Sequence, residues 1–375
     1  PELRDALDAA AIDPSITDIW VAHGTYKPTA VLDAFATFLL RSGVAIHGGF
    51  SGFENSLAQR DLAAGETILS GDIGTAGDDI DNSYHVVVAD GVVAARLDGF
   101  TITAGNANGG GEDDHGGAMV NRSASLDLAN CTFRENSALR YGGGLHGDPT
   151  LVNCTFLRNS AESGGALYVS PPLDISRPLT ITNCIFSGNS AERGGGLFIT
   201  GGELDTETGP IHLTDCIFSG NAAERGGGLF ITGGELDTDT GSIHLTNCIF
   251  WGNQAENEGG GLFITWWEPD GDTRLRLTNC TFYGNAADLG GGLFITWGEP
   301  DQEGDPLPPD LTNCTFYGNV AEAGGAIYAL GPVTTVTPLA VTNSILWGDI
   351  PDEIYTEDDQ NPPVVTYSDV EGGYE

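Results

Sequence analysis

The chain has few basic residues: 14 Lys and Arg stand against 53 Asp and Glu, and the formal net charge is −39. Lys27 is the only lysine. A surface this acidic repels nucleic acid phosphates and anionic membranes, so we expect binding to neither. It favours cations, or a high-salt setting in which screening weakens self-repulsion. Solubility alone is the alternative reason for such a composition.

Long apolar runs are also missing. No stretch of the sequence approaches the ~18 consecutive apolar residues of a membrane-spanning helix, so we expect no membrane insertion. No secretory leader opens the chain at Pro1, and the final residues read as one more coil. We therefore expect a trimmed or partial protein.

Cysteine is present, but paired cysteine motifs are not. The spacing of the seven cysteines follows a repeat and no CxxC metal pattern occurs. Stacked copies of one position lie about 4.8 Å apart with parallel Cα–Cβ vectors, which favours no disulfide. The sequence therefore predicts a ladder of buried free thiols. Its members are Cys131, Cys154, Cys184, Cys216, Cys248, Cys280 and Cys314, with Ser344 in the same position of the last repeat.

An internal repeat dominates what is present. NCIFSGNSAERGGGLFITGGELDTETG (183–209) returns at 215–241, 247–273 and 279–305, and a further copy opens at 313–319. A period of about 32 residues is typical of a solenoid, in which each unit buries its apolar face against its neighbours.

Apolar residues alternate within one unit, IHLTNCIFWGN (243–253), so that Leu245, Cys248 and Phe250 can point inward. The alternation breaks at Asn247, and a left-handed residue there would restore it. The same position is Asn or Asp in each repeat, and stacked amides can bond along the column. These residues are Asn130, Asn153, Asn183, Asp215, Asn247, Asn279, Asn313 and Asn343. A second polar column comprises Asn136, Asn159, Asn189, Asn221, Asn253, Asn285 and Asn319 and ends at Asp349.

Other repeat architectures are excluded. The shortest unit, from Cys131 to Cys154, is too short for a propeller blade, no LxxLxL frame exists, and glycine clusters break every candidate helix. The sequence predicts an all-β protein, a single right-handed parallel β-helix.

Four segments follow from this fold. A short helix in 1–17 caps the stack, with Leu3, Leu7 and Ala10 on one face. Residues 18–97 form irregular coils, 98–349 form the regular repeats with Gly99 in the cysteine position, and 350–375 form a C-terminal coil that we expect to be truncated.

Two short motifs link the repeats to known proteins. Gly324–Ile327 (GGAI) and Phe316–Asn319 (FYGN) match the GGA[IL] and FxxN hallmarks of chlamydial polymorphic outer-membrane protein repeats, which the units resemble. The whole chain is similar to bacterial surface β-helix proteins with choice-of-anchor type sorting domains, through IWVAHGTYKPT, GGFSGFENSLAQRD, DNSYHVV, LDGFTIT and VTYSDVEGG. The resemblance implies secretion and an extracellular or cell-surface location.

Acidic residues align in the insertion that follows each glycine triplet. Stacking would bring these carboxylates within about 5 Å of their copies, which is unfavourable unless they are protonated, screened or bridged. Loops that are solvated and splayed by repulsion are the simpler interpretation, and a calcium ladder is the candidate alternative, because Ca²⁺ bridges such oxygen ligands. The candidate ligands are Glu203, Asp205, Glu235, Asp237, Glu268, Asp270, Glu299 and Asp301. Asp72, Asp78, Asp79 and Asp81 form a second, weaker acidic group.

Aromatic residues form two further columns. Trp251, Tyr283, Tyr317 and Trp347 share one outward position, while Trp266 and Trp297 share another, beside Trp267. Rows of exposed rings suit sugar faces or a partner protein. Packing of the rings under the insertions is the alternative.

No catalytic or cofactor-binding residue is expected. EDDHGG (112–117) resembles the acidic pair and histidine of galacturonases, but one contiguous segment does not reproduce carboxylates from adjacent coils. We therefore expect a secreted or cell-surface structural or adhesive module, with calcium as a candidate stabiliser. The alternatives are a filament subunit that self-associates end to end, and a polysaccharide-binding protein, lyase or hydrolase.

Overall fold

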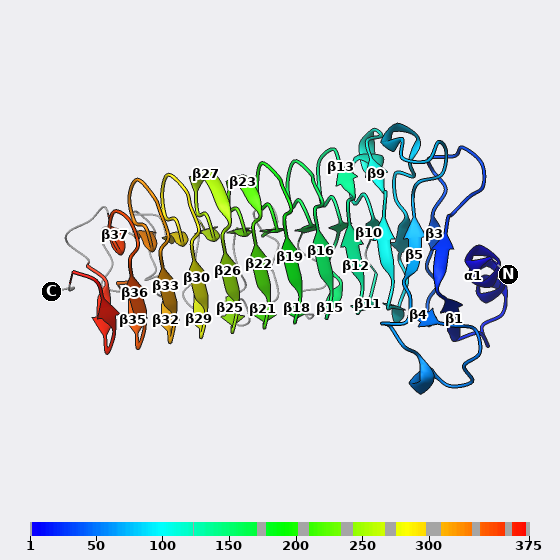
Figure 1. The fold of residues 1–375 in the computed structure, drawn as a ribbon, viewed down its shortest axis with the longest axis horizontal. Coiled ribbons are helices and arrows are strands. Elements are labelled where there is room, and N and C mark those ends of the chain that lie inside the picture. The colour runs from blue at the N-terminus through cyan, green and yellow to red at the C-terminus, as the bar shows by residue number, and fades with distance from the viewer. Residues whose placement is uncertain are drawn as a thin grey trace. The chain divides into compact units, whose positions relative to one another are not determined.

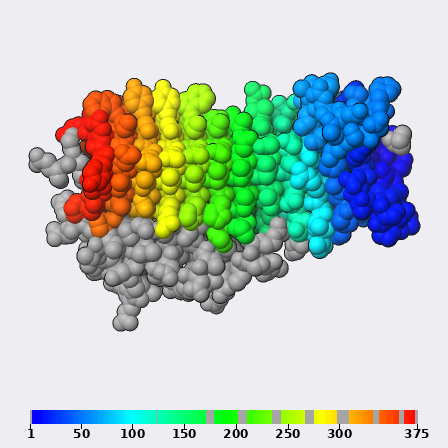
Figure 2. Space-filling view, turned by 90° about the horizontal axis from the view of Figure 1, so that it is seen from below, coloured from blue at the N-terminus to red at the C-terminus, as the bar shows by residue number. Residues whose placement is uncertain are grey.

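The structure is a computed structural model that describes residues 2–122, 124–170, 178–201, 210–233, 243–266, 275–297, 309–331, 338–356 and 362–372. Two compact units, Pro1–Tyr168 and Val169–Glu375, make up the chain. Within each unit, every regular coil adds one short strand to each of three parallel sheets (Figure 1). The coils form separate bands across the molecular surface (Figure 2). We call the sheets first, second and third in the order in which a coil visits them.

Helix α1 (Leu3–Ile12) opens the first unit, and the predicted face of Leu3, Leu7 and Ala10 is buried. The guanidinium of Arg41 holds the helix by donating to the carbonyl oxygen of Leu7 at 3.3 Å. The predicted capping helix is therefore confirmed. In the described part of the chain, no helix is long and apolar enough to cross a bilayer.

Parallel pairing of short strands builds the first unit. Its first sheet comprises β1 (Asp18–Ala22), β4 (Ala45–Phe50), β7 (Ala95–Asp98), β11 (Leu126–Ala129) and β15 (Thr150–Val152). The second comprises β2 (Gly24–Tyr26), β5 (Thr67–Ser70), β8 (Thr101–Thr103), β12 (Thr132–Arg134) and β16 (Thr155–Leu157). The third comprises β3 (Phe38–Leu39), β6 (Val87–Asp90), β10 (Met119–Arg122), β14 (Leu145–His146) and β17 (Leu167–Val169). Strands β9 (Asn106–Ala107) and β13 (Ser137–Ala138) pair separately, and short 3-10 helices η1 (Leu57–Gln59), η2 (Asp79–Asp81) and η3 (Gly111–Asp114) lie in the connections.

The second unit is more regular. Its first sheet comprises β18 (Leu179–Thr182), β21 (Ile211–Thr214), β25 (Ile243–Thr246), β29 (Leu275–Thr278), β32 (Asp310–Thr312), β35 (Ala340–Thr342) and β38 (Val364–Thr366). The second comprises β19 (Ile185–Ser187), β22 (Ile217–Ser219), β26 (Ile249–Trp251), β30 (Thr281–Tyr283), β33 (Thr315–Tyr317), β36 (Ile345–Trp347) and β39 (Asp369–Val370). The third comprises β20 (Leu197–Thr200), β24 (Leu229–Gly233), β28 (Leu262–Trp266), β31 (Leu293–Trp297), β34 (Ile327–Leu330) and β37 (Ile354–Thr356), while β23 (Ala222–Arg225) and β27 (Gln254–Glu258) form a separate pair.

Identical residues stack along the core of the second unit. Leu245 pairs in register with Leu277, and Phe250 with Phe282, whose ring lies 4.7 Å away and nearly parallel. All seven cysteines are buried and free, as the repeat spacing predicted. The predicted inward set is therefore confirmed, and with it the parallel β-helix.

The turn between first and second sheets confirms the left-handed position. Asn247 has φ +54°, and the other Asn and Asp residues predicted at this position also have positive φ. Their side chains bond along the column, as Asn279 Nδ2 does to Asn247 Oδ1 at 3.0 Å. Asn is favoured at this position because its short polar side chain tolerates the left-handed backbone and also bonds to the equivalent Asn of the next coil.

One sequence assignment was wrong. Asp98 pairs with Ala129, and Thr101 pairs with Thr132, so Gly99 aligns with Asn130 and Phe100 aligns with Cys131. Gly99 therefore fills the left-handed position, with φ +82°, and not the cysteine position. Glycine serves there because it adopts positive φ without steric cost.

Candidate functional site

The outward aromatic column of the second unit is confirmed. Trp251, Tyr283, Tyr317 and Trp347 are in register as the last residues of their strands, and their exposed fractions are 54%, 45%, 50% and 46%. Each follows a buried residue of the core, such as Phe250 before Trp251. Strand alternation therefore fixes these rings on the outside.

This column belongs to a larger face without charge, which we call the neutral face. It consists of the outward side chains of six consecutive second-sheet strands, β19 to β36: Ile185, Ser187, Ile217, Ser219, Ile249, Trp251, Thr281, Tyr283, Thr315, Tyr317, Ile345 and Trp347. None is ionisable at neutral pH, in a chain with 53 acidic residues. On the same sheet of the first unit, by contrast, Arg134 points outward and pairs with Glu66 at 3.2 Å.

The geometry of the rings decides what they can contact. The rings of Tyr283 and Tyr317 stack with centroids 5.6 Å apart and planes 3° from parallel. Each ring therefore lies parallel to the other, with one of its faces toward its neighbour. A sugar that stacks on an aromatic ring needs an open face, whereas a protein surface can pack on ring edges.

The other predicted aromatic column is only partly described. Trp266 and Trp297 pair in register at the ends of β28 and β31, which confirms their shared backbone position. Their side chains, and all of Trp267, lie outside the described residues. On the same strands Phe263 and Phe294 are buried, although they alternate with buried Leu and Ile. The third sheet therefore buries both of its faces at these coils.

The predicted calcium ligands of the insertions lie outside the described residues: Glu203, Asp205, Glu235, Asp237, Glu268, Asp270, Glu299 and Asp301. The calcium ladder stays a prediction. In the described ranges, no three His, Cys, Asp or Glu side chains are grouped so as to hold a metal ion. In the second acidic group, Asp78 and Asp81 accept from the main-chain amides of Ile80 and Thr75, at 3.1 and 2.7 Å.

The EDDHGG segment lies within a cluster of histidines, His85, His115 and His146, on the first unit. His115 and His146 lie 5.1 Å apart between ring centroids, and the ring of Tyr141 lies 4.7 Å from His115. The Nε2 atom of His85 is 3.7 Å from a carboxylate oxygen of Asp113. Three coils therefore bring imidazoles, a phenol and a carboxylate together.

Burial favours the neutral imidazole at His85 and His146. It lowers the pKa of His85, and Arg122 adds to the effect. Burial, reinforced by His115 and Arg122, lowers the pKa of His146 to about 4. A neutral imidazole can accept a proton, although the lowered pKa of His85 and of His146 makes each a weaker base than a free imidazole. Of this cluster, the sequence singled out only residues 112–117. One signal was missed: His146 stands at the third-sheet position that Phe fills in several later repeats, and this exchange could have drawn attention to the coil.

Comparisons with known proteins agree with this architecture. The model of the right-handed β-helix region matches residues 74–267, and that of the Chlamydia polymorphic membrane protein repeat matches residues 313–330. The second match spans the GGAI and FYGN motifs and confirms that resemblance. No curated protein matches the chain.

Two solved structures are similar. One is the A-module of the mannuronan C-5 epimerase AlgE4 of Azotobacter vinelandii, with 13% identity and a TM-score of 0.51 over 99% of this chain and 95% of that chain. The other is PfbA, a surface adhesin of Streptococcus pneumoniae, with 11% identity and a TM-score of 0.41 over 98% and 86%. At such identity, the first similarity shows the fold alone. Because the β-helix model covers more than half of its residues, the chain belongs to the right-handed β-helix family.

Proposed function

We propose that the chain is an extracellular or cell-surface β-helix module of structural or adhesive type, which contacts a protein partner through the neutral face. The observation that carries this proposal is the absence of charge from that face in a chain of net charge −39. The match of one repeat to a polymorphic membrane protein repeat supports the surface location.

The composition of the neutral face is that of an interaction surface. The cores of protein interfaces are depleted of charged residues and enriched in Tyr and Trp. Ile249 and Ile345 add exposed apolar area beside the rings. A solvated surface on this acidic chain would carry carboxylates, as the rest of its sequence does.

Adhesion of beads coated with the full chain tests the proposal, with immobilised matrix proteins and a glycan array as the targets. The variant replaces three rings, Trp251→Ser, Tyr283→Ser and Tyr317→Ser. It should still fold, because Ser219 occupies the same position on the neighbouring coil and points outward. We expect adhesion to matrix proteins to fall by about tenfold or more, since aromatic residues dominate interface energies.

Phe53→Ser is the matched control, because Phe53 is an exposed aromatic residue of the first unit. It should leave adhesion unchanged. Equal adhesion by the triple variant and the unmodified chain would contradict the proposal. Loss of binding on the glycan array alone would identify a carbohydrate as the partner instead.

The histidine cluster favours a second candidate function, acid–base chemistry on a polysaccharide. The similar fold of an epimerase contributes no catalytic residues to this argument, which depends on His85, Asp113, His115 and Tyr141. Anionic polysaccharides incubated with the chain would be followed by the absorbance of new double bonds and by reducing ends. Activity that disappears in Asp113→Asn would support an enzyme, and no turnover by the unmodified chain would reject it.

A further inference from the structure

The buried asparagine column of the second unit runs in one direction. Each Asn donates both its main-chain N–H and its side-chain amide to Oδ1 of the Asn in the next coil; between Asn253 and Asn285 these distances are 3.0 and 2.9 Å. The column ends at Asp349, whose Oδ1 accepts both bonds from Asn319. A carboxylate can accept these bonds but has no amide hydrogen to pass on.

A second carboxylate of the same coil completes this end of the column. The main-chain N–H of Asp349 points to Oε1 of Glu353 at 3.4 Å. In the preceding coils the corresponding N–H donates to Oδ1 of the Asn in the next coil. Asp349 and Glu353 are only 6% and 8% exposed. One oxygen of each, Oδ2 and Oε2, is buried and has no hydrogen-bond partner. Two buried carboxylates thus lie together, and each has one oxygen that accepts no hydrogen bond from the described residues.

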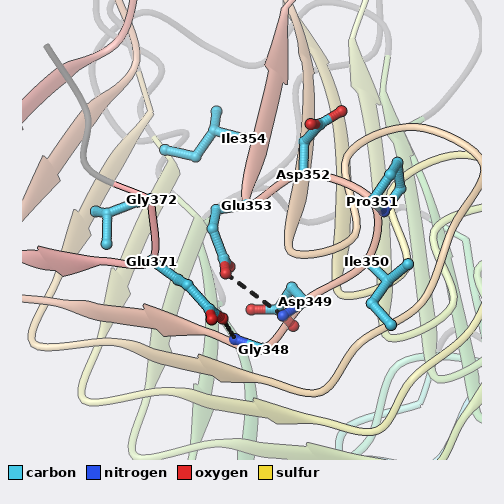
Figure 3. A pocket seen from close by; sticks show the side chains of 10 residues that line it. Gly348, Asp349, Ile350, Pro351, Asp352, Glu353, Ile354, Glu371 and Gly372 are labelled. Atoms are coloured by element: carbon cyan, nitrogen blue, oxygen red, sulfur yellow. Dashed lines mark hydrogen bonds between the residues drawn. The ribbon is translucent and has the colours of Figure 1, made fainter.

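These two side chains line a cavity of about 690 Å³, and the lining also includes Glu371 (Figure 3). Glu371 accepts from the main-chain N–H of Gly348 at 2.7 Å, and Asp352 lies on the wall. No lysine, arginine or histidine belongs to the lining, which is formed by residues 348–354 and 370–372. The described lining residues therefore offer no counter-charge here.

Electrostatics requires that something neutralise the pair. Burial raises the pKa of Asp349. Burial and the neighbouring Asp349 carboxyl raise the pKa of Glu353 to about 8. Two buried carboxylates this close cannot both stay ionised without a partner, so either a proton or a cation must be bound.

We propose that the cavity at Asp349 and Glu353 is a calcium site, in which Ca²⁺ binds oxygens of both carboxylates. Only oxygen ligands are present, which selects a hard cation, and a roomy cavity with irregular geometry suits Ca²⁺ better than octahedral Mg²⁺. Two carboxylate ligands, with water completing the shell, correspond to the weak affinities of extracellular modules, about 10⁻⁴ to 10⁻³ M. This site is separate from the predicted ladder of the insertions and does not depend on the proposed adhesive function.

Thermal unfolding of the full chain, with CaCl₂ or chelator, tests the site. At about pH 9 the proton has left, and we expect about 10 mM Ca²⁺ to raise the melting temperature by about 2 °C. At about pH 6 the proton competes, so the shift should be less than half as large. The absence of any calcium-dependent shift at either pH would overturn the proposal.

Asp349→Asn is the decisive variant, because Asn occupies the other positions of the column and continues its hydrogen bonds. It should remove the calcium shift, and Glu353→Gln, which keeps the acceptor of the Asp349 N–H, should do the same. Asp127→Asn removes one exposed carboxylate of the first unit and should retain the full shift. A full shift in both Asp349→Asn and Glu353→Gln would place the bound calcium elsewhere and overturn the proposal.

Discussion

Asn319 donates both its main-chain N–H and its side-chain amide to a single oxygen, Oδ1 of Asp349, at 2.6 Å each. The corresponding pair of bonds from Asn285 to Asn319 measures 3.0 and 2.9 Å. Bonds to a charged acceptor are shorter and stronger than bonds to a neutral amide, which explains the difference. The column is therefore a polar chain with a defined acceptor end.

The first prediction concerns the pH dependence of that end in the absence of calcium. The pKa of Glu353 is raised to about 8, so the folded state holds a proton that the unfolded chain loses near its ordinary value of about 4.3. The contribution to stability is complete below that value and is lost as the pH rises to about 8. Urea unfolding in chelator, from about pH 5 to pH 9, should show this loss, and Glu353→Gln should flatten it. A wild-type stability that rises across this range would contradict the assignment.

A second prediction concerns the interior of the same column. Asn253→Ala removes the acceptor of two bonds from Asn221 and the donor to the carbonyl of Phe218. Buried polar groups left without partners cost about 1–3 kcal/mol each, so we expect a loss of about 3 kcal/mol or more in the free energy of unfolding. Asn257→Ala, at an exposed position of the same coil, should cost about 0.5 kcal/mol or less. Similar losses in the two variants would show that the buried column does not carry this stability.

A third prediction separates backbone conformation from hydrogen bonding at Asn247, which has φ +54°. Asn247→Gly keeps the left-handed backbone and loses only the side-chain bonds to Asp215 and Asn279. Asn247→Val loses the same bonds and adds strain of about 1–2 kcal/mol. Chemical denaturation should therefore rank the proteins as wild type, then Gly, then Val. A Val variant as stable as the Gly variant would show that this position is not strained.

A fourth prediction concerns Asp98 in the first unit. Burial alone would raise its pKa, but bonds with His47 and Asn130, together with the guanidinium of Arg60, hold that pKa well below its usual range. Stability from Asp98 is therefore present above the unfolded pKa of about 3.8 and is lost as the pH falls below it. Unfolding curves below about pH 4 should show this loss, opposite in sign to that of Glu353, and Asp98→Asn should reduce it. An unchanged acid transition in that variant would contradict this role.

Much of the fold could be predicted because the repeated units show the same sequence of inward, outward and left-handed positions several times. The break in alternation at Asn247 required a left-handed residue, and the position of Trp251 after Phe250 required an outward ring. Gly99 was misplaced because glycine fits either neighbouring position of an irregular coil, and only strand register distinguishes them. Local patterns therefore define a coil well where copies exist, and less well where they do not.

The candidate sites were harder to predict because their residues come from different coils or turn back within one. His85, His115 and His146 have no common motif, and they meet only through the stacking of three coils. In the sequence, Glu353 resembles the other surface acids of the chain. In the structure its side chain is turned inward to Asp349. Long-range register and the direction of a single side chain are properties that a periodic pattern does not contain.

The last prediction concerns the seven cysteines, which are free and buried. Burial raises the pKa of the Cys131 thiol well above its ordinary value, and Cys154 adds to this effect, so the reactive thiolate of Cys131 is scarce in the folded chain. A thiol-specific reagent at about pH 8 should leave the native protein unmodified for hours and should modify all seven residues in denaturant. Intact mass spectrometry counts the modified groups, and a reduced sample provides the control for oxidation.

Because each thiol is held inside the stack, reaction should require the coils to open, and the rate of modification should follow the opening equilibrium as denaturant is raised. Rapid modification of the native chain, or fewer free thiols in denaturant, would show that the ladder is exposed or cross-linked.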